Sequence, residues 1–292
     1  MKILNREIGP GDRPYLIAEM SGNHNQSLER ALEIVDAAAA HGADAIKLQT
    51  YTADTMTLNV RMPGFVIDDP KSLWVGRQLY ELYEEAHTPW AWHQPIMERA
   101  AKHGVHCFST PFDFSAVDFL ESLNVPAYKI ASFENTDLPL IRRVAATGKP
   151  IIMSTGMATA GEIDEAVRAA REAGCQDLVL LKCTSTYPAT AENTNVSTIS
   201  HLRALFGCEV GLSDHTMGCG VSVAATALGD RRSLALALSE LDRMLGATAA
   251  GPIPRFAHAA HGGQLMSRIQ HLLRPRQHPL AIGLSLPLLG IA

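Results

Sequence analysis

The feature that most constrains the fold is a repeat of short apolar runs, each followed by a segment of helical periodicity. The runs have the length and β-branched content of buried strands, and the helical segments place apolar residues about every 3.6 positions. Such an alternation forms a parallel sheet covered by helices. The runs cover residues 15–20, 44–50, 105–110, 127–132, 150–155, 178–183 and 208–213, and the helical segments cover 27–41, 78–103, 114–123, 137–147, 160–173, 196–206 and 218–229.

An α/β fold of the (β/α)8 TIM-barrel type suits this repeat, because the 292 residues of the chain exceed the roughly 250 that one barrel needs. Seven repeats are recognisable, whereas closure needs eight strands and an open sheet would expose its edges. After Ala227-Leu-Gly229 the chain runs into Asp230-Arg-Arg, and the segment 233–240 fits a helix as readily as a strand. We therefore predict a barrel whose eighth strand is missing or replaced, with 280–292 able to supply a strand out of order.

The composition changes sharply near residue 230. Residues 231–292 contain seven arginines against only Glu240 and Asp242, and they contain no Lys, Asn, Val, Tyr, Trp or Cys. This change predicts two regions. Residues 1–230 form an incomplete TIM-barrel domain, and residues 231–292 form an atypical Arg/Leu/Ala-rich tail of unknown structure.

Charge, hydropathy and cysteine content exclude several classes of function. A net charge of −5 gives no basic surface for nucleic acid, and no segment reaches the roughly 18 apolar residues that span a membrane. The five cysteines are odd in number and scattered, which indicates a reduced, cytoplasmic protein. The chain has no Walker loop, dinucleotide-type glycine pattern or Cys-x-x-Cys pair, which argues against ATP, NAD and zinc-finger functions.

Polar side chains close the apolar runs, and the carboxyl ends of the strands carry the chemistry of a barrel enzyme. Lysines supply charge for phosphate and carboxylate groups, and hydroxyls supply directional donors. These groups predict a small phosphorylated acid as ligand, although any one lysine could instead extend into solvent. They are Lys47, Lys129, Lys182, Thr110, Ser132, Ser154, Thr155 and Ser213.

Two carboxylates and one histidine at strand ends are candidates for catalysis. Glu19 and Glu134 could act as general acids or bases, or they could pair with a lysine in a purely structural role. His215, in Gly211-Leu-Ser-Asp-His-Thr216, is a plausible ligand for a divalent metal, but one histidine does not make a site. The aromatic-rich segment 51–92 either packs its aromatic side chains over the barrel or forms a lid or substrate-binding loop.

The strand-end motifs resemble those of the sialic acid synthase family, whose members condense phosphoenolpyruvate with an amino-sugar aldehyde. The resemblance covers residues 15–230. It rests on seven ordered motifs: Ala18-Glu19 with Asn23-His24-Asn25, Lys47-Leu-Gln49-Thr50, Ser109-Thr110-Pro-Phe112-Asp113, Pro126-Ala-Tyr-Lys129-Ile, Gly148 to Met157, Cys183-Thr-Ser-Thr-Tyr187-Pro188 and Gly211 to Thr216.

The resemblance implies a role for each matching residue. Phosphoenolpyruvate would lie on Lys47, Thr110, Lys129, Ser132, Ser154 and Ser213, while Gln49, Glu134 and Tyr187 would face the open-chain sugar. Glu19 would transfer protons, and His215 would bind a divalent metal, Mn²⁺ or Mg²⁺. The family also implies a homodimer.

Within the family, the chain is most similar to the branch that makes pseudaminic acid, as in Glu19-Met-Ser-Gly-Asn-His-Asn25 and Tyr51 to Leu58. That similarity implies a transferase joining phosphoenolpyruvate to 2,4-diacetamido-2,4,6-trideoxy-altrose, with pseudaminic acid and phosphate as products. Such nonulosonic acids serve surface glycans or flagellin glycosylation. Synthesis of N-acetylneuraminate or legionaminate is the alternative.

Two departures from the family pattern concern the end of the chain. The eighth strand of the family carries Glu-Lys-His-Phe, whose histidine is the second metal ligand, and this motif does not follow Gly229. The family's C-terminal antifreeze-like domain, with its sugar-contacting arginine, is not recognisable after residue 230. The chain could therefore be a truncated or frame-shifted inactive copy, or its tail could donate a replacement ligand such as His258 or His261.

Overall fold

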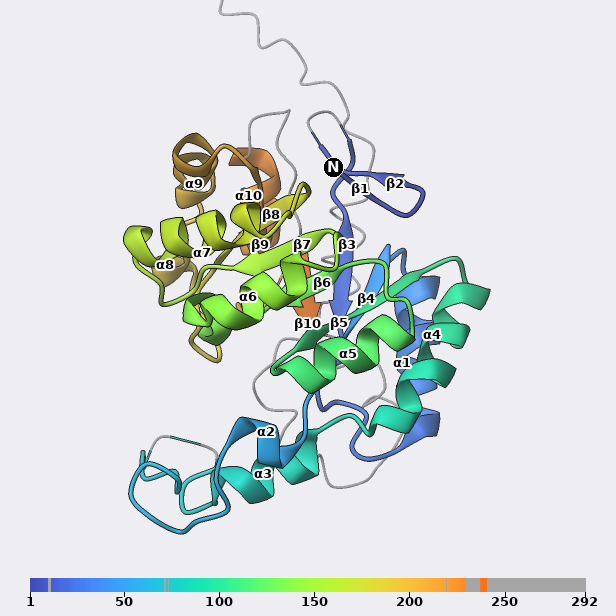
Figure 1. The fold of residues 1–292 in the computed structure, drawn as a ribbon, viewed down its shortest axis with the longest axis vertical. Coiled ribbons are helices and arrows are strands. Elements are labelled where there is room, and N and C mark those ends of the chain that lie inside the picture. The colour runs from blue at the N-terminus through green and yellow to red at the C-terminus, as the bar shows by residue number, and fades with distance from the viewer. Residues whose placement is uncertain (10–11, 71, 73, 219, 229–236, 241–292) are drawn as a thin grey trace, which may run out of the picture.

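The computed structural model describes residues 1–9, 12–70, 72, 74–218, 220–228 and 237–240. Among these, eight parallel strands close a barrel in the order β10-β3-β4-β5-β6-β7-β8-β9 (Figure 1). The predicted TIM-barrel fold is therefore confirmed. The barrel strands are β3 (Leu16–Glu19), β4 (Ala45–Thr50), β5 (His106–Pro111), β6 (Tyr128–Ile130), β7 (Ile151–Ser154), β8 (Leu178–Cys183), β9 (Glu209–Ser213) and β10 (Ala237–Glu240).

The eighth position of the barrel is taken by β10, so the eighth strand is replaced and not missing. β10 pairs in parallel with β3, where Glu240 lies opposite Glu19, and with β9, where Leu238 lies opposite Ser213. The helical alternative for 233–240 is therefore wrong for Ala237–Glu240. The rest of the 231–292 tail, including 280–292, His258 and His261, lies outside the described residues.

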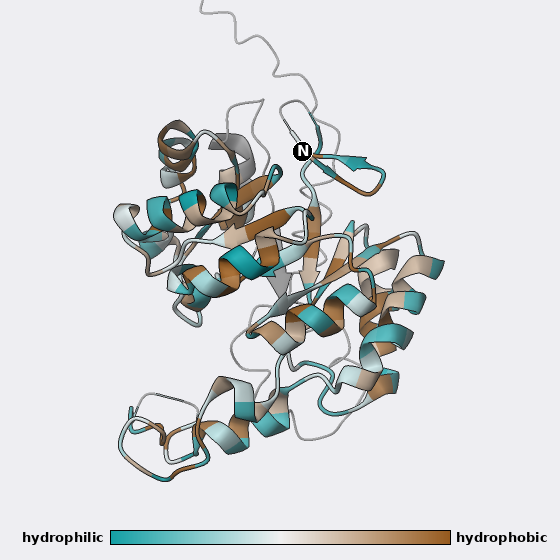
Figure 2. Ribbon diagram, in the orientation of Figure 1, coloured by the Kyte–Doolittle hydropathy of each residue, from teal (hydrophilic) through white to brown (hydrophobic). Residues whose placement is uncertain are grey.

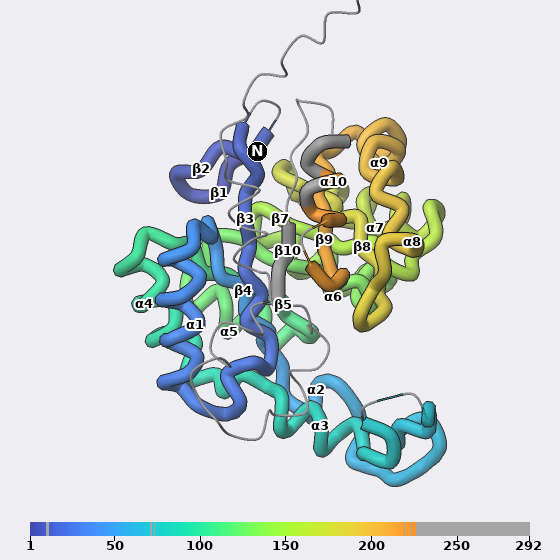
Figure 3. The backbone as a smooth tube through the Cα atoms, turned by 180° about the vertical axis from the view of Figure 1, so that it is seen from behind, coloured from blue at the N-terminus to red at the C-terminus, as the bar shows by residue number. Residues whose placement is uncertain are grey.

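Helices surround the barrel on its outer face (Figures 1 and 3). Their starts follow local sequence rules: Ser27 caps the first, and Thr159 with Glu162 forms a capping box on another. The helices are α1 (Leu28–Ala40), α2 (Ala53–Met56), α3 (Leu79–Ala86), η1 (Trp90–Trp92), α4 (His93–Lys102), α5 (Phe114–Ser122), η2 (Phe133–Thr136), α6 (Leu138–Ala145), α7 (Ala160–Glu172), α8 (Ala191–Thr194), α9 (Thr198–Phe206) and α10 (Gly220–Leu228).

The single helix expected over 78–103 is wrong, because the chain breaks it into α3, η1 and α4. His87 and Pro89 adopt extended backbone angles, with ψ of 149° and 131°. Proline disfavours helical geometry in the residue before it, so the Thr88-Pro89 step ends α3. None of the described helices is long and apolar enough to cross a membrane.

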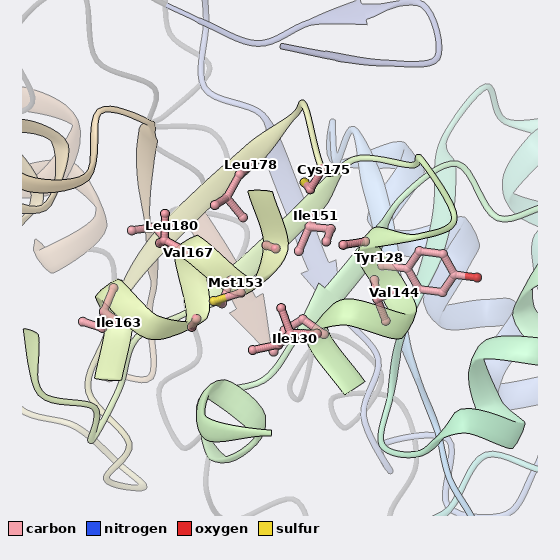
Figure 4. Close-up of a cluster of buried hydrophobic side chains, with 14 of the residues drawn as sticks. Tyr128, Ile130, Val144, Ile151, Met153, Ile163, Val167, Cys175, Leu178 and Leu180 are labelled. Atoms are coloured by element: carbon pink, nitrogen blue, oxygen red, sulfur yellow. The ribbon is translucent and has the colours of Figure 1, made fainter. Parts of the chain in front are cut away.

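Strand alternation separates two apolar layers. Outward residues of β7 and β8, such as Ile151, Met153, Leu178 and Leu180, pack under the surrounding helices, as Figure 4 shows. Inward residues such as Ile152, Val179 and Leu181 fill the barrel and meet the N-terminal hairpin. Apolar residues accordingly concentrate on the strands and on the inner faces of the helices (Figure 2). The hairpin strands are β1 (Lys2–Ile3) and β2 (Arg6–Glu7).

The segment 51–92 carries α2 and α3 away from the barrel, beyond the carboxyl ends of the strands (Figure 1). Two of its tryptophans pack on the barrel side. The Trp90 ring stacks on Phe119 of α5 with centroids 4.7 Å apart, and Trp92 meets His24 edge to face at 5.4 Å. For these two side chains the packing interpretation is confirmed, and the lid interpretation of the segment stays a prediction.

Candidate active site at the carboxyl ends of the strands

A pocket opens at the carboxyl ends of the strands and collects most of the predicted site residues. It is lined by Glu19, Lys47, Gln49, Lys129, Ser132, Ser154, Tyr187, Ser213 and His215. Four predicted residues do not line the pocket itself, namely Thr110, Glu134, Thr155 and Lys182. Three residues that the sequence analysis did not single out do line it, namely Ala131, Phe133 and Cys183.

The alternation of side chains along each strand decides which polar groups reach the pocket. On β4, Ala45 lies in the barrel interior, so Lys47 and Gln49 share its direction. On β8, Val179 and Leu181 point inward, so Cys183 enters the pocket. Lys182, one position earlier, points outward, and its ammonium donates to Cys183 O and Thr184 Oγ1, both at 2.8 Å. The expectation that three lysines share the site is therefore wrong for Lys182.

Lys47 is buried between a carboxylate and a hydroxyl. Its ammonium pairs with the Glu19 carboxylate on the neighbouring strand and donates to Thr110 Oγ1 at 3.1 Å. Thr110 thus supports the pocket through Lys47, although it does not line the pocket. The ion pair places a positive and a negative group side by side at the pocket wall.

Lys129 donates hydrogen bonds to a hydroxyl and to a backbone carbonyl. Its ammonium donates to Ser154 Oγ at 2.7 Å and to Ile130 O at 2.6 Å. Burial, together with the nearby charge of Lys47, lowers the pKa of Lys129 to about 7. An anionic ligand between the two lysines would favour the charged form of Lys129.

Hydrogen bonds join the loops that follow β6 and β7. The Gly156 N–H donates to Ser132 Oγ at 3.2 Å, and the Asn135 side chain donates to Ser154 O at 3.1 Å. Asn135 is fully buried. In the sequence, the position of Asn135 directly after Ser132-Phe-Glu134 is the signal that could have marked it as a support of this site.

The loop that carries His215 is fixed by its neighbour Asp214. The Asp214 carboxylate accepts hydrogen bonds from Thr216 N at 2.9 Å, from Thr216 Oγ1 at 2.7 Å and from Ser222 Oγ. The Ala189 N–H donates to His215 O at 3.0 Å, which joins this loop to the one after β8. The Tyr187 and His215 rings are 4.5 Å apart, and Ser213 Oγ lies 3.4 Å from His215 Nε2.

Cys183 and Glu134 have shifted pKa values in this environment. Burial acts to raise the pKa of the Cys183 thiol, but hydrogen bonding and charge from His215, with the hydroxyls of Ser132 and Ser213, bring that pKa down to about 6. Burial raises the pKa of Glu134. Burial, and to a smaller extent the negative charge of Glu134, raises the pKa of Tyr83 in α3.

The described residues do not by themselves form a site for a divalent metal at His215. Among them, no group of three or more His, Cys, Asp or Glu side chains is arranged to hold an ion. The Glu19 carboxylate pairs with Lys47, and the Asp214 carboxylate accepts from Thr216 and Ser222.

Fold and pocket together define an α/β barrel in which two lysines and several hydroxyls line one pocket at the strand ends. Residues 34–231 match the NeuB family, and the chain belongs to it. The chain is 49% identical over 217 residues to a pseudaminic acid synthase of Campylobacter jejuni and 47% identical over 216 residues to a pseudaminic acid synthase of Helicobacter pylori. Each match covers 74% of this chain, which thus spans about 63% of each relative's length.

A solved structure of the same kind is the N-acetylneuraminic acid synthetase of Leptospira borgpetersenii in complex with citrate. It matches with a TM-score of 0.77 and 25% sequence identity, covering 96% of this chain and 92% of the other. The resemblance to the sialic acid synthase family is thereby confirmed.

Proposed function

We propose that this chain is a phosphoenolpyruvate-dependent synthase that forms pseudaminic acid and phosphate from phosphoenolpyruvate and 2,4-diacetamido-2,4,6-trideoxy-altrose. The observation that carries the proposal is the convergence of the Lys47 and Lys129 ammonium groups, from β4 and β6, on one pocket. Phosphoenolpyruvate has two acidic groups, a carboxylate and a phosphate, and ammonium and hydroxyl donors suit both. The pseudaminic acid synthases of the comparison support the choice of sugar.

The residues divide the pocket between the two substrates. Lys47 with Thr110, and Lys129 with Ser132, Ser154 and Ser213, would bind phosphoenolpyruvate. On the sugar side, Gln49, Glu134 and Tyr187 would contact the open-chain aldehyde. The lysines would also stabilise the negative charge on the departing phosphate.

The reaction forms one C–C bond and breaks one C–O bond. Carbon 3 of phosphoenolpyruvate attacks the aldehyde carbon, whose oxygen takes up a proton. Water then adds at carbon 2 and loses one proton, and the new hydroxyl passes its remaining proton to the departing phosphate as the C–O bond breaks, which leaves the 2-keto acid. Glu19 is our candidate for moving these protons, because a carboxylate in a buried site can act as general acid or base.

The test is sugar-dependent phosphate release by the purified full chain, with Mn²⁺ or Mg²⁺ in the assay. Release with the diacetamido-trideoxy-altrose supports the proposal. Release only with N-acetylmannosamine would instead favour N-acetylneuraminate synthesis, the chemistry named for the Leptospira relative, and the matching legionaminate precursor tests the third product.

An inactive copy predicts a different pattern. Absence of phosphate release with all three sugars would overturn the proposed activity and favour the truncated or frame-shifted alternative.

We also propose that the chain forms a homodimer. Sedimentation of the same preparation measures its oligomeric state, and a monomer would contradict this proposal.

A further inference from the structure

Gly156 lies where three polar side chains converge beside the pocket. A Cβ atom built at this position would overlap Ser185 Oγ, would lie 2.8 Å from Ser132 Oγ and would lie 3.2 Å from Cys183 Sγ. Cβ atoms essentially never come within 3.0 Å of another heavy atom, so the two hydroxyls would have to move. Each hydroxyl ends a flexible side chain and can rotate, so a methyl group at position 156 fits only if Ser132 and Ser185 leave their present positions.

Backbone conformation is not what requires glycine here. Gly156 does not have a positive φ, so an alanine could adopt its backbone angles without strain. The following residue, Met157, takes the left-handed conformation with φ of 68°. The steric requirement thus comes from the three side chains and not from the turn.

The three side chains come from two other loops of the barrel. Ser132 follows β6, and Cys183 and Ser185 belong to the end of β8 and the loop after it. Gly156, after β7, lies between them and donates its N–H to Ser132 Oγ at 3.2 Å. A methyl group at position 156 would therefore push Ser132 away from the pocket while leaving the lysines of β4 and β6 unchanged.

We propose that Gly156 is a positioning residue whose missing side chain lets Ser132 reach the phosphoenolpyruvate side of the pocket. This inference rests on the proposed function, since Ser132 is assigned to that substrate there. It adds a residue that contacts no substrate and acts only through the hydroxyls packed against its α-carbon.

The first experiment compares Gly156→Ala with Gly161→Ala in the full chain. At Gly161, in α7, a new Cβ would meet only Thr159 Oγ1 at 3.9 Å, so this variant adds the same methyl group without a clash. We expect Gly156→Ala to weaken phosphoenolpyruvate affinity about tenfold to a hundredfold, with an unchanged KM for the sugar. Gly161→Ala should match the parent in both, and an unchanged phosphoenolpyruvate affinity in Gly156→Ala would overturn the proposal.

The second experiment removes the hydroxyl through which the proposal acts. Ser132→Ala deletes the Oγ that a Cβ at position 156 would meet at 2.8 Å. In a Ser132→Ala background, Gly156→Ala should therefore cause little further loss of phosphoenolpyruvate affinity, a non-additive result. Additive losses would show that Gly156 does not act through Ser132 and would overturn the proposal, even if Gly156→Ala also lowers Tm.

A third measurement separates this inference from the proposed function. If the parent chain does not bind phosphoenolpyruvate, the proposed function fails, but the packing around Gly156 can still be read from Cys183. Labelling of Cys183 by a small thiol reagent, followed by peptide mass spectrometry, should change severalfold in rate in Gly156→Ala and not in Gly161→Ala. Equal Cys183 labelling in both variants would overturn the positioning role.

Discussion

The carboxylate of Glu19 and the ammonium of Lys47 form an ion pair at the ends of neighbouring strands, where their side chains are 9% and 6% exposed. Among the described residues, Glu19 Oε1 has no hydrogen-bond partner. One carboxylate oxygen therefore pairs with the lysine, and the other is left open toward the pocket as far as the described residues extend.

Replacing Glu19 with glutamine should separate binding from catalysis. The amide keeps the shape of the side chain but removes the charge, so Lys47 becomes available to the anionic substrate. We expect kcat to fall by about 10²- to 10⁴-fold, with a KM for phosphoenolpyruvate that is equal or lower. Steady-state assays of phosphate release measure both constants, and a kcat close to that of the parent would remove Glu19 from proton transfer.

Lysine substitutions should distinguish strand-end lysines that point into the pocket from one that points out of the barrel. Loss of a charge-assisted contact costs about 1.5–3 kcal/mol, or roughly tenfold to a hundredfold in affinity. Lys47→Met and Lys129→Met should each weaken phosphoenolpyruvate binding by this amount in calorimetry. Lys182→Met is the matched control, since Lys182 also ends a strand but points out of the barrel. A loss in the control as large as in the other two would contradict the assignment.

The lowered pKa of Lys129, about 7, predicts a pH dependence of binding. Above this pH the free protein holds Lys129 neutral, so binding an anion must take up a proton, and affinity should fall between pH 7 and pH 9 by up to about tenfold per unit. Calorimetry in buffers of different ionisation enthalpy should detect that proton. Lys129→Met should lose both the slope and the proton uptake, and a persistent slope would assign it to another group.

The same pKa shift has a defined sign for stability. A lysine with a lowered native pKa binds its proton more weakly in the folded than in the unfolded state, so the free energy of unfolding should rise with pH above about 7 and level off near the ordinary lysine pKa. Urea unfolding of the parent and of Lys129→Met between pH 7 and pH 10 measures this difference. Identical pH profiles in the two proteins would contradict it.

Asp214 should contribute to stability through the loop that it fixes. Asp214→Ala would remove the hydrogen bonds from Thr216 N, Thr216 Oγ1 and Ser222 Oγ, each of which contributes about 0.5–1.5 kcal/mol. The exposed Asp164, paired with Arg168 on one face of α7, is the control, and such pairs contribute at most about 1 kcal/mol. Comparable unfolding free energies for Asp214→Ala and Asp164→Ala would show that the loop does not depend on Asp214.

The sequence by itself determined the barrel and the identity of most pocket residues. Parallel strands bring their carboxyl ends to one rim, so Lys47, Lys129, Ser154 and Ser213 could be expected to meet without any knowledge of long-range contacts. Caps such as Thr159 with Glu162 were also readable, because their hydrogen bonds span only three residues.

Only the tertiary structure decided the inward or outward direction of adjacent strand residues. Side chains alternate between the two faces of a strand, so a shift of one residue in the strand's register would place Lys182 in the pocket instead of Cys183. The apolar run does not define where the strand ends to within one residue, so the sequence could not decide between the two. The Glu19–Lys47 pair and the three side chains around Gly156 likewise join residues from different strands and loops. Finally, Ala237–Glu240 has no distinctive strand pattern, and its backbone pairing with β3 and β9 is what makes it the eighth strand.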